Sequence, residues 1–256
     1  MVRRWFSAAH SGRQELLGLA LLYAIYEVVR GVGGENWVAA LAHTDEIVAL
    51  EQQLGLYVEQ GVQESVSGLA GMPALLGVLY VGLHFLGTAA AIFWVHRRHP
   101  EAYPVVRTTL VAATAIALVG YIAYPAAPPR LSDLGFADTV TESTGLNLSS
   151  DLLGSFYNPI AAVPSLHFGY AVIVGAALAA LAGRRFVRVA GPLYPMLMLY
   201  VIVATGNHFF FDAAAGGLTV VLGWIMARSL VGARSSSARE VIRPGFRVRA
   251  EQATGC

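Results

Sequence analysis

Long apolar runs separated by short polar turns dominate the sequence. Six of these runs are long enough to be considered as membrane spans, at 16–32, 73–94, 105–124, 164–181, 189–205 and 208–230. A helix needs about 20 mostly apolar residues to cross the hydrocarbon layer of a bilayer. The pattern therefore predicts an all-α membrane protein, built as a bundle of six transmembrane helices.

The segment between the first two runs has a different pattern. Apolar residues recur there at 3-4-3 spacing, at Ile47, Leu50, Leu54 and Tyr57. The polar positions on the opposite face are Glu46, Glu51, Gln52 and Gln53. This segment is too charged to span, so we expect an amphipathic helix or helix pair that lies along the membrane surface. Thr44 is the expected N-cap of the helix. A role in gating substrate is open, although a packing role is favoured.

These patterns divide the chain into three parts. Residues 1–70 hold the first span and the interfacial amphipathic helices, residues 71–231 form a membrane core, and residues 232–256 are a Ser- and Arg-rich tail expected to be disordered. Within the core, residues 131–157 form a polar loop rich in Ser, Thr, Asp, Asn and Gly, which we expect to be irregular with room for one short helix.

The composition agrees with a membrane protein. The chain is 56% hydrophobic and 13% charged, with a mean hydropathy of +0.58, and we expect the lipid bilayer rather than a nucleic acid as its partner. Its single cysteine, Cys256, gives neither a disulfide framework nor a metal-binding spacing. We expect no cofactor, and the sequence does not indicate the oligomeric state.

The distribution of the basic residues predicts the topology. All 17 are arginines. With six spans and a cytoplasmic N-terminus, only Arg30 and Arg130 fall outside the cytoplasm, which satisfies the positive-inside rule. The protein is thus expected to be a multi-pass plasma membrane protein with both termini in the cytoplasm. The arginines placed on the cytoplasmic side are Arg3, Arg4, Arg13, Arg97, Arg98, Arg107, Arg184, Arg185, Arg188, Arg228, Arg234, Arg239, Arg243, Arg247 and Arg249.

Ionisable residues just inside the apolar runs are the candidates for chemistry. His208 and Asp212 are four residues apart, which places them on one helix face. A carboxylate there can accept a proton from one ring nitrogen of the imidazole and leave the other nitrogen free to act as a nucleophile or base. His167, just inside another run, supplies a second imidazole suited to general acid work.

Two further residues suit the binding of an anion. Ser165 stands at the start of a predicted helix, where free N–H groups and a hydroxyl can bind a phosphate. Arg130 is expected on the same outer side of the membrane, and its planar guanidinium suits a phosphate as well. Together with the two histidines, these residues suit phosphoryl transfer through a phosphohistidine on the extracytoplasmic side.

Three sequence blocks carry a family resemblance. The segments 128–130 (Pro-Pro-Arg), 164–167 (Pro-Ser-Leu-His) and 208–212 (His-Phe-Phe-Phe-Asp) resemble the signature blocks of the type-2 phosphatidic acid phosphatase superfamily. The segments 162–169 and 207–212 are more similar to its inositol phosphorylceramide synthase-like branch. The resemblance covers roughly residues 75–230. It implies a six-helix catalytic membrane core that acts on a membrane lipid phosphate.

The resemblance also implies roles for individual residues. His208 would be the nucleophile that attacks phosphorus, Asp212 its orienter and His167 the acid that protonates the leaving group. Arg130 and Ser165 would bind the phosphate, and we group Asn207, which precedes His208 in the third block, with them. No metal is implied.

The chain departs from the superfamily pattern at several positions. Ala123 stands where the first block has lysine, and Val201 and Ile202 stand where the third block has Ser-Arg. Two cations of the usual phosphate clamp are therefore missing. A phosphodiester carries one negative charge and a phosphomonoester nearly two, so a site with one arginine favours headgroup transfer from a phospholipid. The alternative is a lipid phosphate phosphatase acting on phosphatidate or a polyprenyl phosphate.

Other interpretations of the polar residues stay open. A transporter could use Glu27, His84 and the site histidines along a path, although the candidate residues gather at one membrane face. Two histidines and a carboxylate could also bind a metal. For Glu27 an intrahelical pair with Arg30 is the simpler expectation, and for His84 a hydrogen-bonded position within the bundle.

Overall fold

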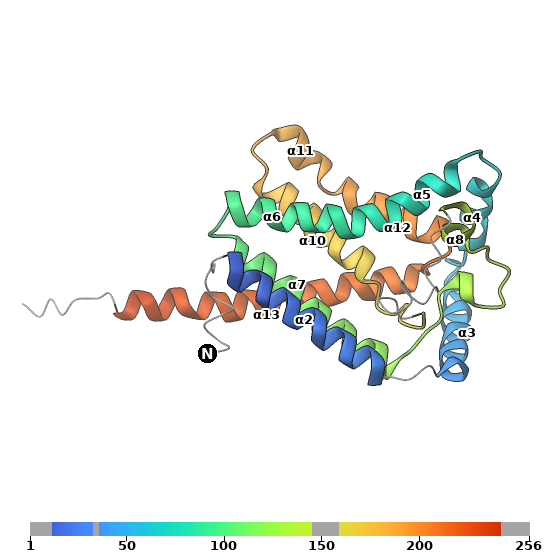
Figure 1. Ribbon diagram of the computed structural model, residues 1–256, viewed down its shortest axis with the longest axis horizontal. Coiled ribbons are helices and arrows are strands. Elements are labelled where there is room, and N and C mark those ends of the chain that lie inside the picture. Colours follow the sequence, from blue (N-terminus) through green and yellow to red (C-terminus); the bar gives the residue numbers. More distant parts are fainter. Residues whose placement is uncertain (1–11, 33–35, 145–158, 242–256) are drawn as a thin grey trace, which may run out of the picture.

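The computed structural model describes residues 12–32, 36–144 and 159–241, and this part of the chain is helical (Figure 1). Its only extended pairing is an isolated parallel bridge between Ala126 and Ala161. The all-α prediction is therefore confirmed. The helices are α2 (Gly12–Val32), α3 (Trp37–Gln53), α4 (Glu59–Ser67), α5 (Met72–Gly82), α6 (Thr88–Arg98), α7 (Tyr103–Ala123), α8 (Thr139–Thr144), α10 (Leu166–Leu181), α11 (Arg185–Ala190), α12 (Leu193–Ala204) and α13 (Phe210–Val241), with a π-helical turn η1 (Leu83–Gly87) between α5 and α6 and a 3₁₀ turn η2 (Pro129–Leu131).

Four helical segments of the described chain are long and apolar enough to cross a membrane. They are Met72–Arg98, Tyr103–Ala123, Arg185–Ala204 and Phe210–Val231. α10 is apolar but shorter, and α2 forms where the first span was predicted without being among the four. The predicted second, third, fifth and sixth runs are thus helices of spanning length, whereas the count of six spans is not confirmed.

The longest helices pack side by side. α13 lies along α7 and also contacts α10 (Figure 1). The close approach of α13 to α7 depends on Gly223, where a Cβ atom would come within 2.9 Å of the Thr109 carbonyl oxygen. Large apolar side chains such as Val78, Leu86 and Val119 are exposed on the outer surface. Such a surface is typical of helices that contact lipid tails rather than water.

The two ends of the bundle differ in composition. The end of α6, the short helix α11 and the far part of α13 lie toward one end, and α3, α4 and α8 lie toward the other (Figure 1). The first end carries the arginines Arg97, Arg98, Arg184, Arg185, Arg188 and Arg228. The predicted topology places all six of these arginines on one side of the membrane, so it requires them to lie at the same end of the bundle.

The helix α3 crosses the end of the bundle, transverse to the long helices (Figure 1). It begins earlier than predicted, because Asn36 and not Thr44 is its N-cap: the Asn36 side chain accepts a hydrogen bond from the Ala39 N–H (3.1 Å). Thr44 is buried in mid-helix and donates to the Ala40 carbonyl. The predicted polar face is also partly reversed, since Glu51 is buried while Leu50 is exposed.

Several predicted features fall at or beyond the limits of the described chain. α13 continues to Val241, past residue 231, where the sequence predicted the end of the ordered core. Residues 242–256 of the predicted tail lie outside the described part. The side chains of Glu27 and Arg30 also lie outside it. The described part of the polar loop, residues 131–144, begins at the end of η2 and holds the short helix α8, in agreement with the expectation for that part.

Candidate functional site

Main-chain hydrogen bonds join the segments that carry the three sequence blocks. The Ala126 N–H, two residues before the first block, donates to the Ile160 carbonyl (2.9 Å), four residues before the second. The Arg130 N–H, in the first block, donates to the Gly206 carbonyl (2.9 Å), two residues before the third. Main-chain bonds of this kind fix backbone positions whatever the side chains do. Segments far apart in the chain are therefore held at one place.

His208 and Asp212 form the predicted pair, although not on one helix face as expected, because His208 lies two residues before the start of α13. The His208 Nδ1 and the Asp212 Oδ2 are 3.1 Å apart, and both side chains are buried. The same carboxylate oxygen accepts the Phe209 N–H (3.0 Å), so Asp212 also caps the start of α13. With an ionised carboxylate at Nδ1, the proton of the neutral imidazole stays on that nitrogen and Nε2 keeps its lone pair.

His167 stands in the first turn of α10, beside this pair. Ser165 is the N-cap of α10, and its hydroxyl accepts the Phe168 N–H (3.4 Å). The His167 ring stacks on Tyr80, with ring centroids 4.2 Å apart, and lies 5.6 Å from the His208 ring. The predicted helix start at Ser165 thus places the two imidazoles next to each other.

Arg130 is held from two sides. Its Nε donates to the Asn207 Oδ1 (2.8 Å), and its Nη1 pairs with the Asp138 Oδ2 (2.9 Å). The Asn207 amide nitrogen donates to the Thr205 hydroxyl (2.9 Å). Asp138 lies in the polar loop just before α8 and is not among the predicted site residues. No spacing rule links it to Arg130, because the two side chains meet only when the loop folds back toward η2.

His84 is a further histidine at the site, and the sequence analysis interpreted it as a hydrogen-bonded bundle residue. Its ring stacks on His167 with centroids 4.0 Å apart, and its buried Nδ1 has no hydrogen-bond partner in the described chain. It lies in the π-helical turn η1, whose Leu83 carbonyl accepts a hydrogen bond from the Tyr194 hydroxyl (2.8 Å). π-helical turns frequently occur at functional sites. The hydrogen bond expected for His84 is therefore not found at Nδ1 within the described chain.

A cavity of about 840 Å³ opens beside the histidines. Of the six predicted site residues, His167, Asn207 and His208 line it, while Arg130, Ser165 and Asp212 are buried behind them. At the far end, Glu15 and Arg107 also line it. The cavity therefore extends along the bundle from the histidines toward the arginine-rich end. Its walls are largely aromatic and apolar, and include Tyr23, Tyr26, Phe85, Ile92, Phe93 and Tyr121.

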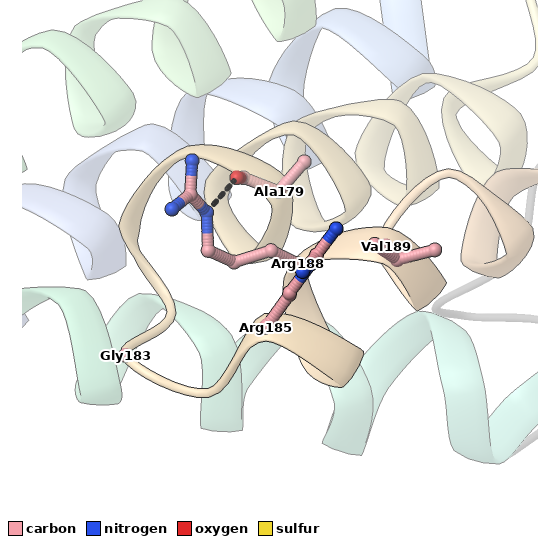
Figure 2. Close-up of a pocket in the computed structure, with 5 residues that line it drawn as sticks. All are labelled: Ala179, Gly183, Arg185, Arg188 and Val189. Carbon is pink, nitrogen blue, oxygen red and sulfur yellow. Dashed lines mark hydrogen bonds between the residues drawn. The ribbon is translucent and has the colours of Figure 1, made fainter.

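A second hollow, of about 430 Å³, lies at the arginine-rich end between α10 and α11 (Figure 2). The Arg188 Nε donates there to the Ala179 carbonyl (3.2 Å), and Arg185 lies beside it. Neither a histidine nor a carboxylate lines this hollow. His167, Asn207 and His208 line the larger cavity instead. Within the described residues, moreover, no three His, Cys, Asp or Glu side chains are arranged to hold a metal.

The fold and the site define a helical membrane protein with a histidine–carboxylate pair beside a second imidazole, next to an apolar cavity. The sequence pattern of the PAP2 superfamily matches residues 45–226, and the chain belongs to that superfamily. Its members are phosphatases and phosphotransferases. Comparisons with curated proteins and with solved structures find no match. The superfamily assignment is confirmed, and the branch within it stays a prediction.

Proposed function

We propose that this protein is an integral membrane enzyme that transfers a phosphoryl group from a lipid phosphate ester through a phosphohistidine at His208. The observation that carries the proposal is the hydrogen-bonded pair of His208 and Asp212 next to His167, all beside an apolar cavity. A lipid substrate could place its phosphate at the two imidazoles and its apolar tail between the helices that line the cavity.

The reaction would proceed in two steps. In the first, the His208 Nε2 attacks phosphorus, so that a P–N bond forms while the P–O bond to the leaving group breaks. His167 donates its proton to that leaving oxygen. In the second step, the oxygen of an acceptor hydroxyl attacks the same phosphorus, the P–N bond breaks, and His167 takes up the acceptor's proton. Asp212 holds the His208 tautomer and stabilises the positive charge on its ring.

The remaining site residues have supporting roles in this proposal. Asn207 lines the cavity and can contact the phosphate directly. Arg130 lies behind Asn207 and holds its side-chain oxygen, so it orients Asn207. Ser165 keeps the start of α10, and with it His167, in place. Phosphate binding by Arg130 and Ser165 themselves stays a prediction.

The charge of the site favours a phosphodiester substrate. The Arg130 guanidinium is paired with the Asp138 carboxylate, so its positive charge is largely balanced within the protein. A diester with one negative charge suits such a site better than a monoester with nearly two. We therefore place the protein in the inositol phosphorylceramide synthase-like branch, as a headgroup phosphotransferase. A lipid phosphate phosphatase is the alternative.

We place the site on the extracytoplasmic side of the plasma membrane. The arginine-rich end of the bundle would face the cytoplasm under the positive-inside rule. The histidine site lies toward the opposite end, near α3 and α4. The transverse helix α3 would lie in the outer interface, with exposed apolar residues such as Leu50 and Leu54 in contact with lipid.

The test uses the purified full-length protein and His208→Ala in lipid vesicles. Each is incubated with ³²P-labelled phosphatidate, polyprenyl phosphate and a phospholipid with an inositol phosphate headgroup, with and without an added alcohol acceptor. We expect label from the diester to move to the acceptor, and an acid-labile phosphoenzyme to accumulate on rapid quenching. His208→Ala should show neither.

The outcomes separate the candidate functions. Stoichiometric release of inorganic phosphate from phosphatidate, with the diester untouched, would select the phosphatase. Turnover by His208→Ala at the native rate would refute the phosphohistidine. Uptake of an intact lipid across the vesicle membrane without any phosphorus-containing product would select a transporter.

A further inference from the structure

The start of α13, the helix that carries Asp212, is held by carboxylates from outside the three sequence blocks. The Phe210 N–H donates to the Glu59 Oε1 (3.1 Å), and the Phe211 N–H donates to the Glu51 Oε1 (2.7 Å). The first N–H groups of a helix have no partner within the helix itself. Here Glu51 of α3 and Glu59 at the start of α4 satisfy two of them.

The two carboxyl groups are buried together. Glu51 is 2% exposed and Glu59 is 0% exposed. The second oxygen of each, Oε2, has no hydrogen-bond partner in the described chain. The N–H groups that the two carboxyl groups accept belong to adjacent residues, Phe210 and Phe211, so the two side chains lie next to each other. Two ionised carboxylates are acceptors only, so a hydrogen bond between them requires that one carry a proton.

The electrostatic surroundings favour this protonated form. Burial, followed by a hydrogen bond that the protonated Glu51 carboxyl group would donate to Glu59, raises the pKa of Glu51 from its ordinary value of 4.5 to about 8, against the lowering effect of the Phe211 N–H. Asp212 adds a further negative charge nearby. Tyr57 faces the pair as well, and burial together with the two carboxylates raises the pKa of its hydroxyl.

We propose that Glu51 and Glu59 share one proton and act together as positioning residues, which fix the start of α13 and thereby the Asp212–His208 pair. One charge on the pair matches the positive end of the helix dipole. A second charge would repel Asp212 and loosen the cap. The catalytic part of this inference rests on the proposed function, while the shared proton can be tested without it.

The experiment compares Glu51→Gln, Glu51→Ala and the control Glu64→Gln in the full-length protein. Glutamine keeps an oxygen that can accept the Phe211 N–H and an amide that can donate to Glu59, but it never ionises. Alanine removes both functions. Glu64 is an exposed acid on α4, so its replacement makes the same change of side chain away from the pair. The readouts are kcat, KM, their pH profiles, and the infrared C=O band of a protonated carboxyl group.

We expect native protein and Glu64→Gln to show the carboxyl band at neutral pH, and Glu51→Gln to have lost it. Glu51→Ala should lower kcat by about 100-fold with little change in KM, because a small misplacement of a catalytic group has this size of effect. Glu51→Gln should keep a kcat near the native one. It should also stay active at alkaline pH, where loss of the shared proton reduces native activity.

Absence of the band in the native protein at neutral pH would overturn the shared proton. A native kcat in Glu51→Ala, or a Glu51→Gln profile that falls at alkaline pH as the native one does, would overturn the positioning role. If Glu51→Ala does not fold, the infrared band and the Glu51→Gln profile decide. If the native protein shows no turnover with any lipid phosphate, the proposed function fails, while the infrared result still decides on the shared proton.

Discussion

The main-chain N–H of Ser165 donates a hydrogen bond to the carbonyl oxygen of Asp212, at 2.9 Å. This bond joins the N-cap of α10 to the first turn of α13. His167 lies two residues after Ser165, and Asp212 bonds to His208. The relative position of the two imidazoles therefore depends on the backbone of both helices, and not on flexible side chains alone.

Replacement of Asp212 by asparagine should lower kcat by about 10²–10⁴-fold, since an amide group can turn its NH₂ toward the His208 Nδ1 and stabilise the wrong tautomer. KM should change little. Activity is measured on the diester substrate, with circular dichroism and gel filtration to check that the protein stays folded. Activity close to native would contradict the orienter role of Asp212.

The contact between α10 and α13 leaves no room for a side chain at Gly216. A Cβ atom there would lie 2.1 Å from the Ser165 carbonyl oxygen, whereas one at Gly217 would make an ordinary contact with Phe168 at 3.5 Å. We expect Gly216→Ala to cost roughly 1–3 kcal/mol of stability and to lower activity. The control Gly217→Ala should behave like the native protein. Thermal unfolding in detergent and turnover measure both effects, and equal behaviour of the two variants would contradict the close approach.

Arg130→Lys should lower kcat/KM by about 10-fold or more, because a lysine cannot hold Asn207 and Asp138 at once as the guanidinium fork does. Arg188→Lys is the matched control, since Arg188 is exposed and makes a single bond to the Ala179 carbonyl. Steady-state kinetics on both variants gives the comparison. A fully active Arg130→Lys would show that only the charge of Arg130 is needed.

The stability of the protein should depend on pH through Glu51. Its pKa is about 8 in the folded protein, above the ordinary 4.5, so between these values the folded state holds a proton that the unfolded chain has lost. Native stability therefore falls as pH rises from about 5 to 8, and this contribution levels off above 8. The melting temperature of Glu51→Gln minus that of the native protein should therefore increase as the pH rises from 5 to 8. A constant difference from pH 5 to 8 would contradict the raised pKa.

The far end of the cavity holds a buried ion pair between Glu15 of α2 and Arg107 of α7, and the Tyr103 hydroxyl also donates to Glu15 (3.1 Å). Removal of one charge should destabilise the protein by about 3–5 kcal/mol. We expect Glu15→Gln and Arg107→Met each to unfold at lower temperature, and the double variant to lose less than the sum of the two. Additive losses would show that α2 is not attached to α7 through this pair.

The sequence predicts the parts of the site that depend on local spacing. The sequence places His208 and Asp212 close enough to bond, although His208 precedes α13 rather than lying on it, and Ser165 at a helix start determines its cap. Contacts made by long-range folding are not predictable in this way. Asp138 reaches Arg130 only through the fold of a polar loop, and Glu51 reaches α13 across 160 residues of sequence.

The amphipathic pattern of α3 shows the same limit. A polar helix face is commonly solvated, and the sequence alone does not distinguish that case from a face that is buried against a helix end. Glu51 belongs to the second case. The stacked position of His84 likewise depends on the π-helical turn, which no spacing of residues predicts.

The two carboxylates that accept N–H groups at the start of α13 show how much of the chain contributes to the site. Both come from the first 70 residues, which the hydropathy pattern separates from the membrane core. The superfamily match starts at residue 45, ahead of Glu51. The matched region thus includes the two acids together with the histidines, and a protein trimmed to residue 71 would keep His208, the proposed nucleophile, but lose the two carboxyl groups that hydrogen-bond to the start of α13.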